Sequence, residues 1–366
     1  MRKYSWLAAS SLTLAAAPAI ADTSSFTDMF KYNGFGTAGV ARSDTNEAEF
    51  VQSGQNLGAT ENFDWKTDSK LGLQGSVSPT SWLSGTVQML SAERFSNHIS
   101  TEIEWAFAKV TPLPGLSFRG GKMALPTFLV SDSRYVGYAN SWVRAPDEVY
   151  GPATFDTFKG YDVSYQHAIG KYSLTVGALA GSTVADFMLY PGVAIIAEGH
   201  NLRGYSATFD MNVATVRVSR VTSDITVILG GPILAKLVYT FTSFGVTYDH
   251  DNVVAQGEFI EKRSDGSVGP FSPNGWYVMG GYHVNKWLPY AIYAAGHQNG
   301  GAGGTVHEAN RSTASVGVRL DLIKNVDVKA QIDHVKAYPD GSPFINVRPG
   351  FNDSANVVSL VVDFVF

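Results

Sequence analysis

The chain has 366 residues, of which 45% are hydrophobic, and it contains 37 glycines and no cysteine. This length allows two soluble domains or one large all-β unit, and the lack of cysteine excludes a small disulfide-stabilised scaffold. The formal net charge is −5, with acidic and basic residues scattered rather than gathered in blocks, so nucleic acid is not an expected partner.

The first 21 residues, MRKYSWLAASSLTLAAAPAIA, have the pattern of a secretory signal peptide. Arg2 and Lys3 form a basic start, an apolar run follows, and Ala19-Ile20-Ala21 offers a small-residue cleavage site. We therefore expect residues 1–21 to be removed on export and residues 22–366 to form the folded domain. No other stretch approaches the ~18 apolar residues of a transmembrane helix, so any membrane span must use strands.

From residue 30 onward, polar and apolar residues alternate with a period of two, which predicts strands rather than helices. From 314 to 322 every even position is Ala, Val or Leu, whereas the odd positions 313–321 are polar, charged or Gly. Residues 325–336 repeat this pattern, and in 101–108 we expect Ile103, Trp105 and Phe107 on the face opposite Glu102 and Glu104. Such stretches predict sixteen strands, at 30–42, 67–78, 82–93, 100–111, 115–122, 158–167, 171–181, 199–209, 212–222, 237–249, 252–263, 275–284, 287–297, 311–322, 325–336 and 355–366.

The predicted connections alternate between tight turns and links that are mostly long. Short turns at one end and long loops at the other are typical of an antiparallel transmembrane β-barrel. In hydrocarbon every backbone N–H and C=O group needs a partner, so a sheet must close on itself and turn its apolar side chains toward lipid. About sixteen strands would enclose an aqueous channel. A soluble β-sandwich also alternates, but it does not require an even strand count with alternating loop lengths.

The last predicted strand ends in an aromatic residue, Phe366, and has apolar residues at every second position before it. Together with the leader and the sixteen-strand meander, this ending resembles the trimeric general porins of Gram-negative outer membranes, over essentially the whole mature chain. The resemblance implies a homotrimer in the outer membrane, in contact with lipid and lipopolysaccharide. It also implies an assembly signal that the barrel-assembly machinery reads, made of Leu360, Val362, Phe364 and Phe366.

The longest stretch without a strand pattern runs from about 123 to 157, between the fifth and sixth predicted strands. A compact domain rarely holds ~35 structureless residues without a functional reason. In porins the third long loop lies at this position, folds inward and narrows the pore, and the resemblance implies the same here. The short PEFGG-type motif of enterobacterial porins is absent. The charged residues that we expect to line the constriction are Asp132, Arg134, Arg144, Asp147, Glu148 and Asp156.

Five basic residues are expected on the barrel wall facing this loop, because their sequence neighbours are predicted to face lipid. A charge on a lipid-facing surface at the bilayer midplane costs about 2–4 kcal/mol, so strand parity is a strong guide. Acidic loop residues opposite basic wall residues would set up a transverse field that selects ions by charge. The wall candidates are Lys70, Arg119, Arg217, Arg319 and Lys329.

We therefore expect a water-filled channel for passive diffusion of small hydrophilic solutes and ions, with no catalysed reaction, cofactor or metal site. One alternative is a substrate-selective channel that prefers anions, since Arg134 and Arg144 could form an anion site. Another is a barrel enzyme or adhesin. The segment 34–39, GFGTAG, fits the dinucleotide-binding pattern G-x-G-x-x-G, but no preceding strand or following helix is readable, so we expect these glycines of the first strand to permit bending or close packing at the barrel wall.

Overall fold

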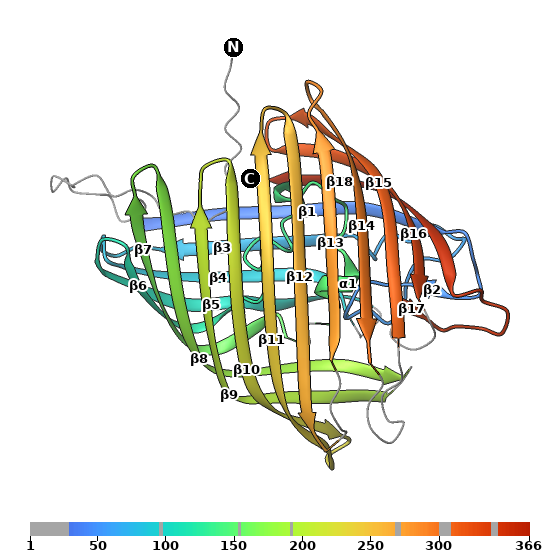
Figure 1. The fold of residues 1–366 in the computed structure, drawn as a ribbon, viewed down its shortest axis with the longest axis horizontal. Coiled ribbons are helices and arrows are strands. Elements are labelled where there is room, and N and C mark those ends of the chain that lie inside the picture. The colour runs from blue at the N-terminus through green and yellow to red at the C-terminus, as the bar shows by residue number, and fades with distance from the viewer. Residues whose placement is uncertain are drawn as a thin grey trace.

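The computed structural model describes residues 29–94, 98–152, 155–190, 193–267, 272–299, 309–337 and 343–366. These residues form sixteen antiparallel strands that close into one barrel, as the alternation predicted (Figure 1). Each barrel strand pairs with the next barrel strand along the chain, and the first pairs with the last. Within the described residues, no helix is long and apolar enough to cross a membrane. The proposed signal peptide, residues 1–21, lies outside the described part of the chain.

All sixteen predicted strands are found, and two short strands, β2 (Glu49–Phe50) and β17 (Phe344–Ile345), pair with each other in a separate two-stranded sheet. Strands β8 to β11 are longer than predicted, so the connections expected at 182–198 and 223–236 are largely strand. The barrel strands are β1 (Phe30–Ser43), β3 (Lys70–Val77), β4 (Leu83–Glu93), β5 (Ile99–Leu113), β6 (Leu116–Ala124), β7 (Thr157–Ile169), β8 (Tyr172–Tyr190), β9 (Val193–Asp210), β10 (Ala214–Leu229), β11 (Ile233–His250), β12 (Val253–Gly266), β13 (Pro273–Tyr282), β14 (Trp287–Gln298), β15 (Ala309–Ile323), β16 (Val326–Ala337) and β18 (Ser354–Val365).

The tight turns lie at one end of the barrel, the end at which the C-terminus also lies (Figure 1). Asn212, Asn285 and Asn325 adopt positive φ angles of 70°, 57° and 66° in three of these turns. Tight hairpin turns require such angles because they match the right-handed twist of the flanking strands, and asparagine tolerates them well. We call this the turn end of the barrel and the opposite end the loop end.

The two faces of the strands differ as the alternation predicted. On β18, Val358 and Leu360 are 53% and 50% exposed on the outer face, whereas Ser359 and Asp363 are each 1% exposed on the inner face. Most of β15 and β16 follows the same rule, with Arg319, Lys329 and Asp333 turned inward and Val316 and Ile332 outward, whereas at the loop end of β16 Val335 is buried and Lys336 is exposed. The barrel therefore has an apolar outer surface around a polar interior.

The stretch 101–108 departs from the predicted alternation. The register between β4 and β5 shifts where Gln88 pairs with Trp105 and Met89 pairs with Ile103, which leaves Glu104 as the extra residue of a β-bulge. Ile103 stays exposed on the outer face, but Trp105 lines an inner cavity and the nearby Phe107 packs against buried inner side chains. Our expectation that Ile103, Trp105 and Phe107 share the outer face is wrong, because one inserted residue reverses the faces beyond it.

The barrel closes where β1 meets β18, and two glycines of β1 make room there for the last two aromatic rings. A Cβ atom on Gly34 would lie 2.2 Å from the ring of Phe366, and one on Gly36 would lie 2.4 Å from the ring of Phe364. The two rings stack on one another with centroids 6.3 Å apart. The prediction that glycines of this segment permit close packing at the wall is confirmed.

Candidate pore constriction

The segment 125–156 leaves β6, enters the barrel and returns to β7; we call it the inner loop. It contains the 3-10 helix η2 (Gly137–Ala139) and the short helix α1 (Asp147–Tyr150). η2 contacts β1 and β18, and α1 contacts β12, β13, β14 and β15, so the loop reaches across the interior (Figure 1). The inward fold that the resemblance implied for the third long loop is confirmed.

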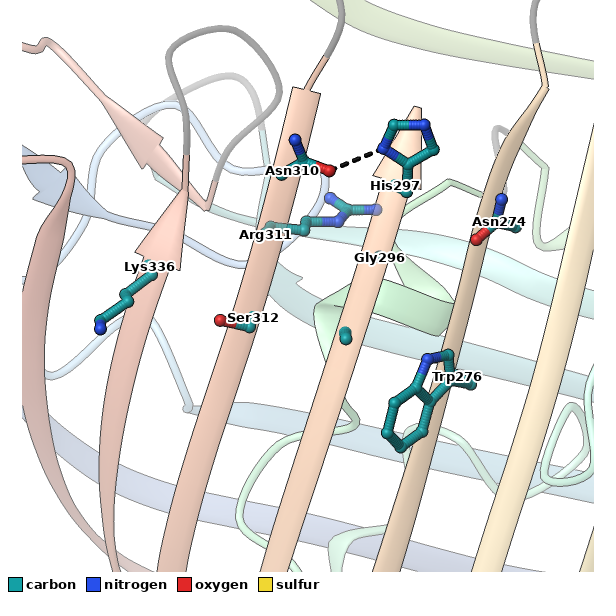
Figure 2. A pocket seen from close by; sticks show the side chains of 9 residues that line it. Asn274, Trp276, Gly296, His297, Asn310, Arg311, Ser312 and Lys336 are labelled. Carbon is teal, nitrogen blue, oxygen red and sulfur yellow. Dashed lines mark hydrogen bonds between the residues drawn. The ribbon is translucent and has the colours of Figure 1, made fainter. Parts of the chain in front are cut away.

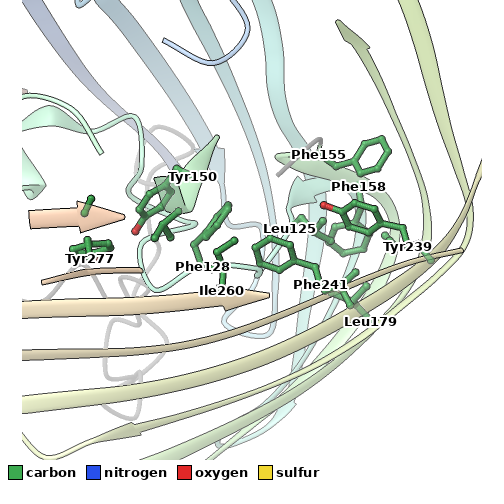
Figure 3. Close-up of a cluster of buried hydrophobic side chains, with 14 of the residues drawn as sticks. Leu125, Phe128, Tyr150, Phe155, Phe158, Leu179, Tyr239, Phe241, Ile260 and Tyr277 are labelled. Atoms are coloured by element: carbon green, nitrogen blue, oxygen red, sulfur yellow. The ribbon is translucent and has the colours of Figure 1, made fainter. Parts of the chain in front are cut away.

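An apolar cluster fastens one side of the inner loop to the wall (Figure 3). The ring of Phe128 lies 4.5 Å from that of Tyr150 and 5.3 Å from that of Phe241 on β11, and Tyr150 also packs near Tyr277 on β13. All four side chains are almost fully buried. Burying a large aromatic side chain contributes about 1.5–3 kcal/mol, so this side of the barrel interior is filled by a packed core.

Glu258 on β12 holds both limbs of the inner loop. Its carboxylate accepts a hydrogen bond from the backbone N–H of Leu129 on the outgoing limb and one from the hydroxyl of Tyr150 on the returning limb, each 2.8 Å long. Glu258 is 3% exposed. An acceptor that is buried between two donors fixes the positions of both, because each donor would be left unsatisfied without it.

Two of the predicted wall cations bind the backbone of the inner loop. Lys329 donates hydrogen bonds to the carbonyl oxygen of Gly137 and to the carboxylate of Asp363, both at 2.7 Å. Arg319 donates to the carbonyl oxygens of Tyr138 and Asn140 at 2.9 and 3.1 Å. Both cations point inward, as parity predicted, but they are buried beneath the loop.

The other three wall candidates have different surroundings. Arg119 is paired with Asp162 on β7 through its guanidinium group. Arg217 donates to the carbonyl oxygen of Pro126 at 3.5 Å, where the inner loop begins. Lys70 borders the larger of two cavities beside the inner loop, which are described below. All five wall candidates therefore face inward, and three of them contact the inner loop.

Arg144 connects the inner loop to four other parts of the chain. Its guanidinium lies 3.2 Å from a carboxylate oxygen of Asp68 and 3.2 Å from one of Asp333, and it also donates to the hydroxyl of Ser359. It lies over the ring of Phe50, 4.9 Å from the centroid. Burial raises the pKa of the Asp68 carboxyl, and the neighbouring guanidinium opposes this shift. Arg144 is thus enclosed rather than open to a permeating anion.

The two acidic residues of helix α1 that were predicted to line the constriction are also bound by partners on the wall. Asp147 forms an ion pair of 2.8 Å with Arg311 on β15. Glu148 is 1% exposed and accepts a hydrogen bond of 2.6 Å from the hydroxyl of Thr313. Burial raises the pKa of the Glu148 carboxyl, and the Thr313 hydrogen bond opposes the shift. Both acids lie against β15, away from Lys329.

The remaining loop charges gather near β4 and β5. Arg134 pairs with Asp156, and the hydroxyl of Tyr135 donates to the second oxygen of the same carboxylate at 2.6 Å. The nearby Asp132 is exposed. The structure therefore brings Arg134 and Asp156 together near β4 and β5, whereas Asp147 and Glu148 lie against β15.

Two cavities border the inner loop, and they share four residues. The larger has a volume of about 790 Å³, and the smaller, of about 20 Å³, lies between the inner loop and the wall at β4 and β5. The shared residues are Glu104, Arg134, Tyr135 and Asp156. We call this meeting point the neck. Glu104 was not among the predicted site residues, although the alternation of 101–108 had already placed it opposite an apolar face.

A further pocket lies on the outside of the barrel (Figure 2). It has a volume of about 320 Å³ at the loop end of β13 to β16, where His297 and Asn310 are joined by a hydrogen bond of 2.6 Å. Trp276 is exposed there, and it pairs with Ala295, which shares its face. The pocket opens away from the interior and takes no part in the neck. In the described part of the chain, no three acidic or histidine side chains are grouped so that they could hold a metal ion.

Comparison with known proteins places the fold. No family model and no curated protein matches the chain. Among solved structures it is similar to OmpF of Salmonella typhi in complex with daunomycin (TM-score 0.61, 13% identity, 93% of this chain and 99% of that chain). It is also similar to an anion-selective porin from Comamonas acidovorans (TM-score 0.60, 11% identity, 92% and 99%) and to the trimer form of OmpT, an outer membrane protein of Vibrio cholerae (TM-score 0.56, 13% identity, 93% and 100%). The chain therefore has the closed, sixteen-stranded fold of these outer-membrane proteins.

Proposed function

We propose that this protein is a porin of the outer membrane, which forms a water-filled channel for passive diffusion of small hydrophilic solutes and ions. The observation that carries the proposal is the cavity of about 790 Å³, bordered by many charged side chains, inside a closed barrel whose outer face is apolar. An apolar outer face is stable against lipid, and full closure leaves no unpaired strand edge. The interior is then available to water.

The neck between the inner loop and β4–β5 would set the size limit of this channel. The inner loop is held there from several sides, by the apolar cluster, by Glu258 and by the buried cations Arg319 and Lys329. A restriction that must exclude larger solutes benefits from such fixed walls, because a mobile loop would open and close with thermal motion. Catalysis and a cofactor form no part of the proposal.

The proposal includes export by a cleaved signal peptide, insertion by the barrel-assembly machinery through the C-terminal strand, contact with membrane lipid and lipopolysaccharide, and assembly as a homotrimer. The trimer is supported by the similar fold of a protein whose structure is described as a trimer form. The outer apolar surface offers the area that such contacts need. Crosslinking of the protein in native membranes should give a ladder that ends at three subunits, and a ladder that ends at one would contradict the trimer.

Recording from single molecules in planar lipid bilayers tests the channel. We expect a large conductance that is linear with voltage and unaffected by small sugars or amino acids. The folded state of the sample is checked independently, because intact barrels migrate differently from heat-unfolded ones in detergent gels. Folded protein without conductance would overturn the proposal. Saturable block by one class of solute would favour the substrate-selective alternative.

A further inference from the structure

The charges that line the larger cavity are unequal in sign. Nine acidic residues and five basic residues border it among those that the structure describes. The acids are Asp68, Glu93, Glu102, Glu104, Asp147, Glu148, Asp156, Asp186 and Asp333, and the bases are Lys70, Arg94, Lys122, Arg134 and Arg144. The lining of the larger cavity therefore holds more acidic than basic residues.

The two loop cations are matched by carboxylates that lie against them. Arg134 is paired with Asp156, and Arg144 lies between Asp68 and Asp333. Their side chains are only 14% and 7% exposed. A cation enclosed in this way presents little positive potential to a passing ion, because its field is cancelled at short range by its partners.

The wall of β4 and β5 on the other side of the neck is less well compensated. Glu102 and Glu104 share one cation, Arg94, at 3.3 and 3.5 Å. Glu102 keeps half of its side chain exposed to the cavity. Glu93 is 5% exposed, and its carboxylate oxygens accept no hydrogen bond from the described residues, with the ammonium of Lys66 3.8 Å away. Three carboxylates thus border the larger cavity on this side, beside the two cations Arg94 and Lys122, and the ammonium of Lys122 is bound to the carbonyl oxygen of Ile103.

We infer that the channel prefers small cations, and that Glu102 and Glu104 on the wall, rather than Asp147 and Glu148 on the inner loop, determine this preference. The inference rests on the proposed channel function. Field lines are focused inside a narrow tube of low dielectric, so an unbalanced charge at the neck acts on every ion that passes. Both side chains point into the interior, Glu102 by the alternation of β5 and Glu104 at the β-bulge.

Reversal potentials in a potassium chloride gradient test the inference. Wild-type protein should pass potassium in preference to chloride. The double variant Glu102→Gln with Glu104→Gln should lower the permeability ratio by about twofold or more, whereas Arg94→Gln should raise it, because the signs of the removed charges are opposite. An unchanged ratio in the double variant, or a wild-type preference for chloride, would overturn the inference.

Two further variants separate this inference from simpler explanations. The double variant Glu198→Gln with Glu261→Gln removes the same charge from residues that line neither cavity, and it should leave the ratio unchanged. Asp147→Asn with Glu148→Gln should change the ratio less than the wall variant does, since these acids are paired or buried. A larger effect of the loop variant would contradict the assignment to the wall. A folded wild-type protein with no conductance would instead refute the channel function itself.

Discussion

Lys329 and Asp363 form an ion pair of 2.7 Å that is buried between β16 and β18, and the same ammonium group holds the carbonyl oxygen of Gly137 at the tip of the inner loop. Asp327 lies 3.4 Å from it on the other side. The pair belongs to the wall, but its third contact belongs to the loop. The position of the constriction is therefore coupled to the closing strands of the barrel.

Replacing Lys329 should destabilise the barrel strongly. Lys329→Met leaves the carboxylates of Asp363 and Asp327 buried without this cation, and removing one partner of a buried pair costs about 3–5 kcal/mol. The midpoint of urea unfolding in detergent measures the change. Lys336→Met removes an exposed cation from the outer face of the same strand and should shift stability by less than about 0.5 kcal/mol. Equal midpoints for the two variants would contradict the role given to Lys329.

Replacing Glu258 should loosen the inner loop. Glu258→Leu leaves the N–H of Leu129 and the hydroxyl of Tyr150 without their acceptor, and each buried unpaired group costs about 1–3 kcal/mol. We expect a noisier single-channel current with added conductance levels. Glu258→Gln keeps one acceptor oxygen and should have an intermediate effect. Glu261→Leu, on the other face of the same strand, should behave as wild type. A single-channel current from Glu258→Leu without added noise or conductance levels would contradict the role of Glu258 in holding the inner loop.

The seam between β1 and β18 should not tolerate a side chain at Gly36. In Gly36→Val the new Cβ atom would lie 2.4 Å from the ring of Phe364, so the ring must leave its seat. Overpacking of this kind costs about 1–3 kcal/mol. Gly280→Val is the matched control, because no heavy atom lies within 4 Å of a Cβ there. After refolding, the folded fraction of Gly36→Val, read from heat-dependent gel mobility, should be clearly lower than that of Gly280→Val. Similar fractions would contradict the close packing of Phe364 against Gly36.

The stability of the barrel should depend on pH through Glu148, which lies on the inner loop outside the strands. Burial raises the pKa of its carboxyl above the ordinary value of 4.5. The folded state then keeps this proton at pH values where the unfolded chain has released it, so the contribution of Glu148 to stability falls as the pH rises from 4.5 through the raised pKa.

Glu148→Gln cannot lose a proton at this position and keeps an oxygen that can accept from Thr313. The variant should therefore become more stable relative to wild type, with a rising midpoint of unfolding, as the pH rises from 4.5 through the raised pKa of Glu148. A difference between the two proteins that does not change with pH would show that Glu148 titrates at its ordinary value.

The fold was predictable because β-barrel strands carry their own local pattern. Val358, Leu360 and Val362 alternate with Ser359 and Asp363 in the sequence, and alternation is a property that each strand shows without reference to its partners. Strand ends were less predictable: β8 to β11 continue well beyond the stretches with a clear pattern. The β-bulge at Glu104 was missed because it depends on the register between two strands, which no single strand encodes.

The sequence predicted on which face of the wall the candidate site residues lie, but it did not predict the partners that they contact. Parity placed Arg319 and Lys329 inside the barrel, and they are inside. Their partners, Gly137 and Asn140, are far away in the sequence and contribute only backbone carbonyl oxygens, which carry no residue signature. Arg144 was read as a candidate anion site because its sequence neighbours gave no hint of Asp68 and Asp333, which meet it only after the barrel has closed.

The packing of the inner loop against one part of the wall makes the interior asymmetric, with open space on the other side. Among the described residues, strands β9 to β13 contribute none that line either cavity, because the loop covers their inner face, while β3 to β5 border the open space. The barrel wall is thus divided into an arc that packs against the inner loop and an arc that borders the open cavity, and in the proposed channel the second arc serves permeation. Substitutions among apolar residues on the first arc should alter stability and leave ion selectivity unchanged, so the two properties can diverge independently among related chains.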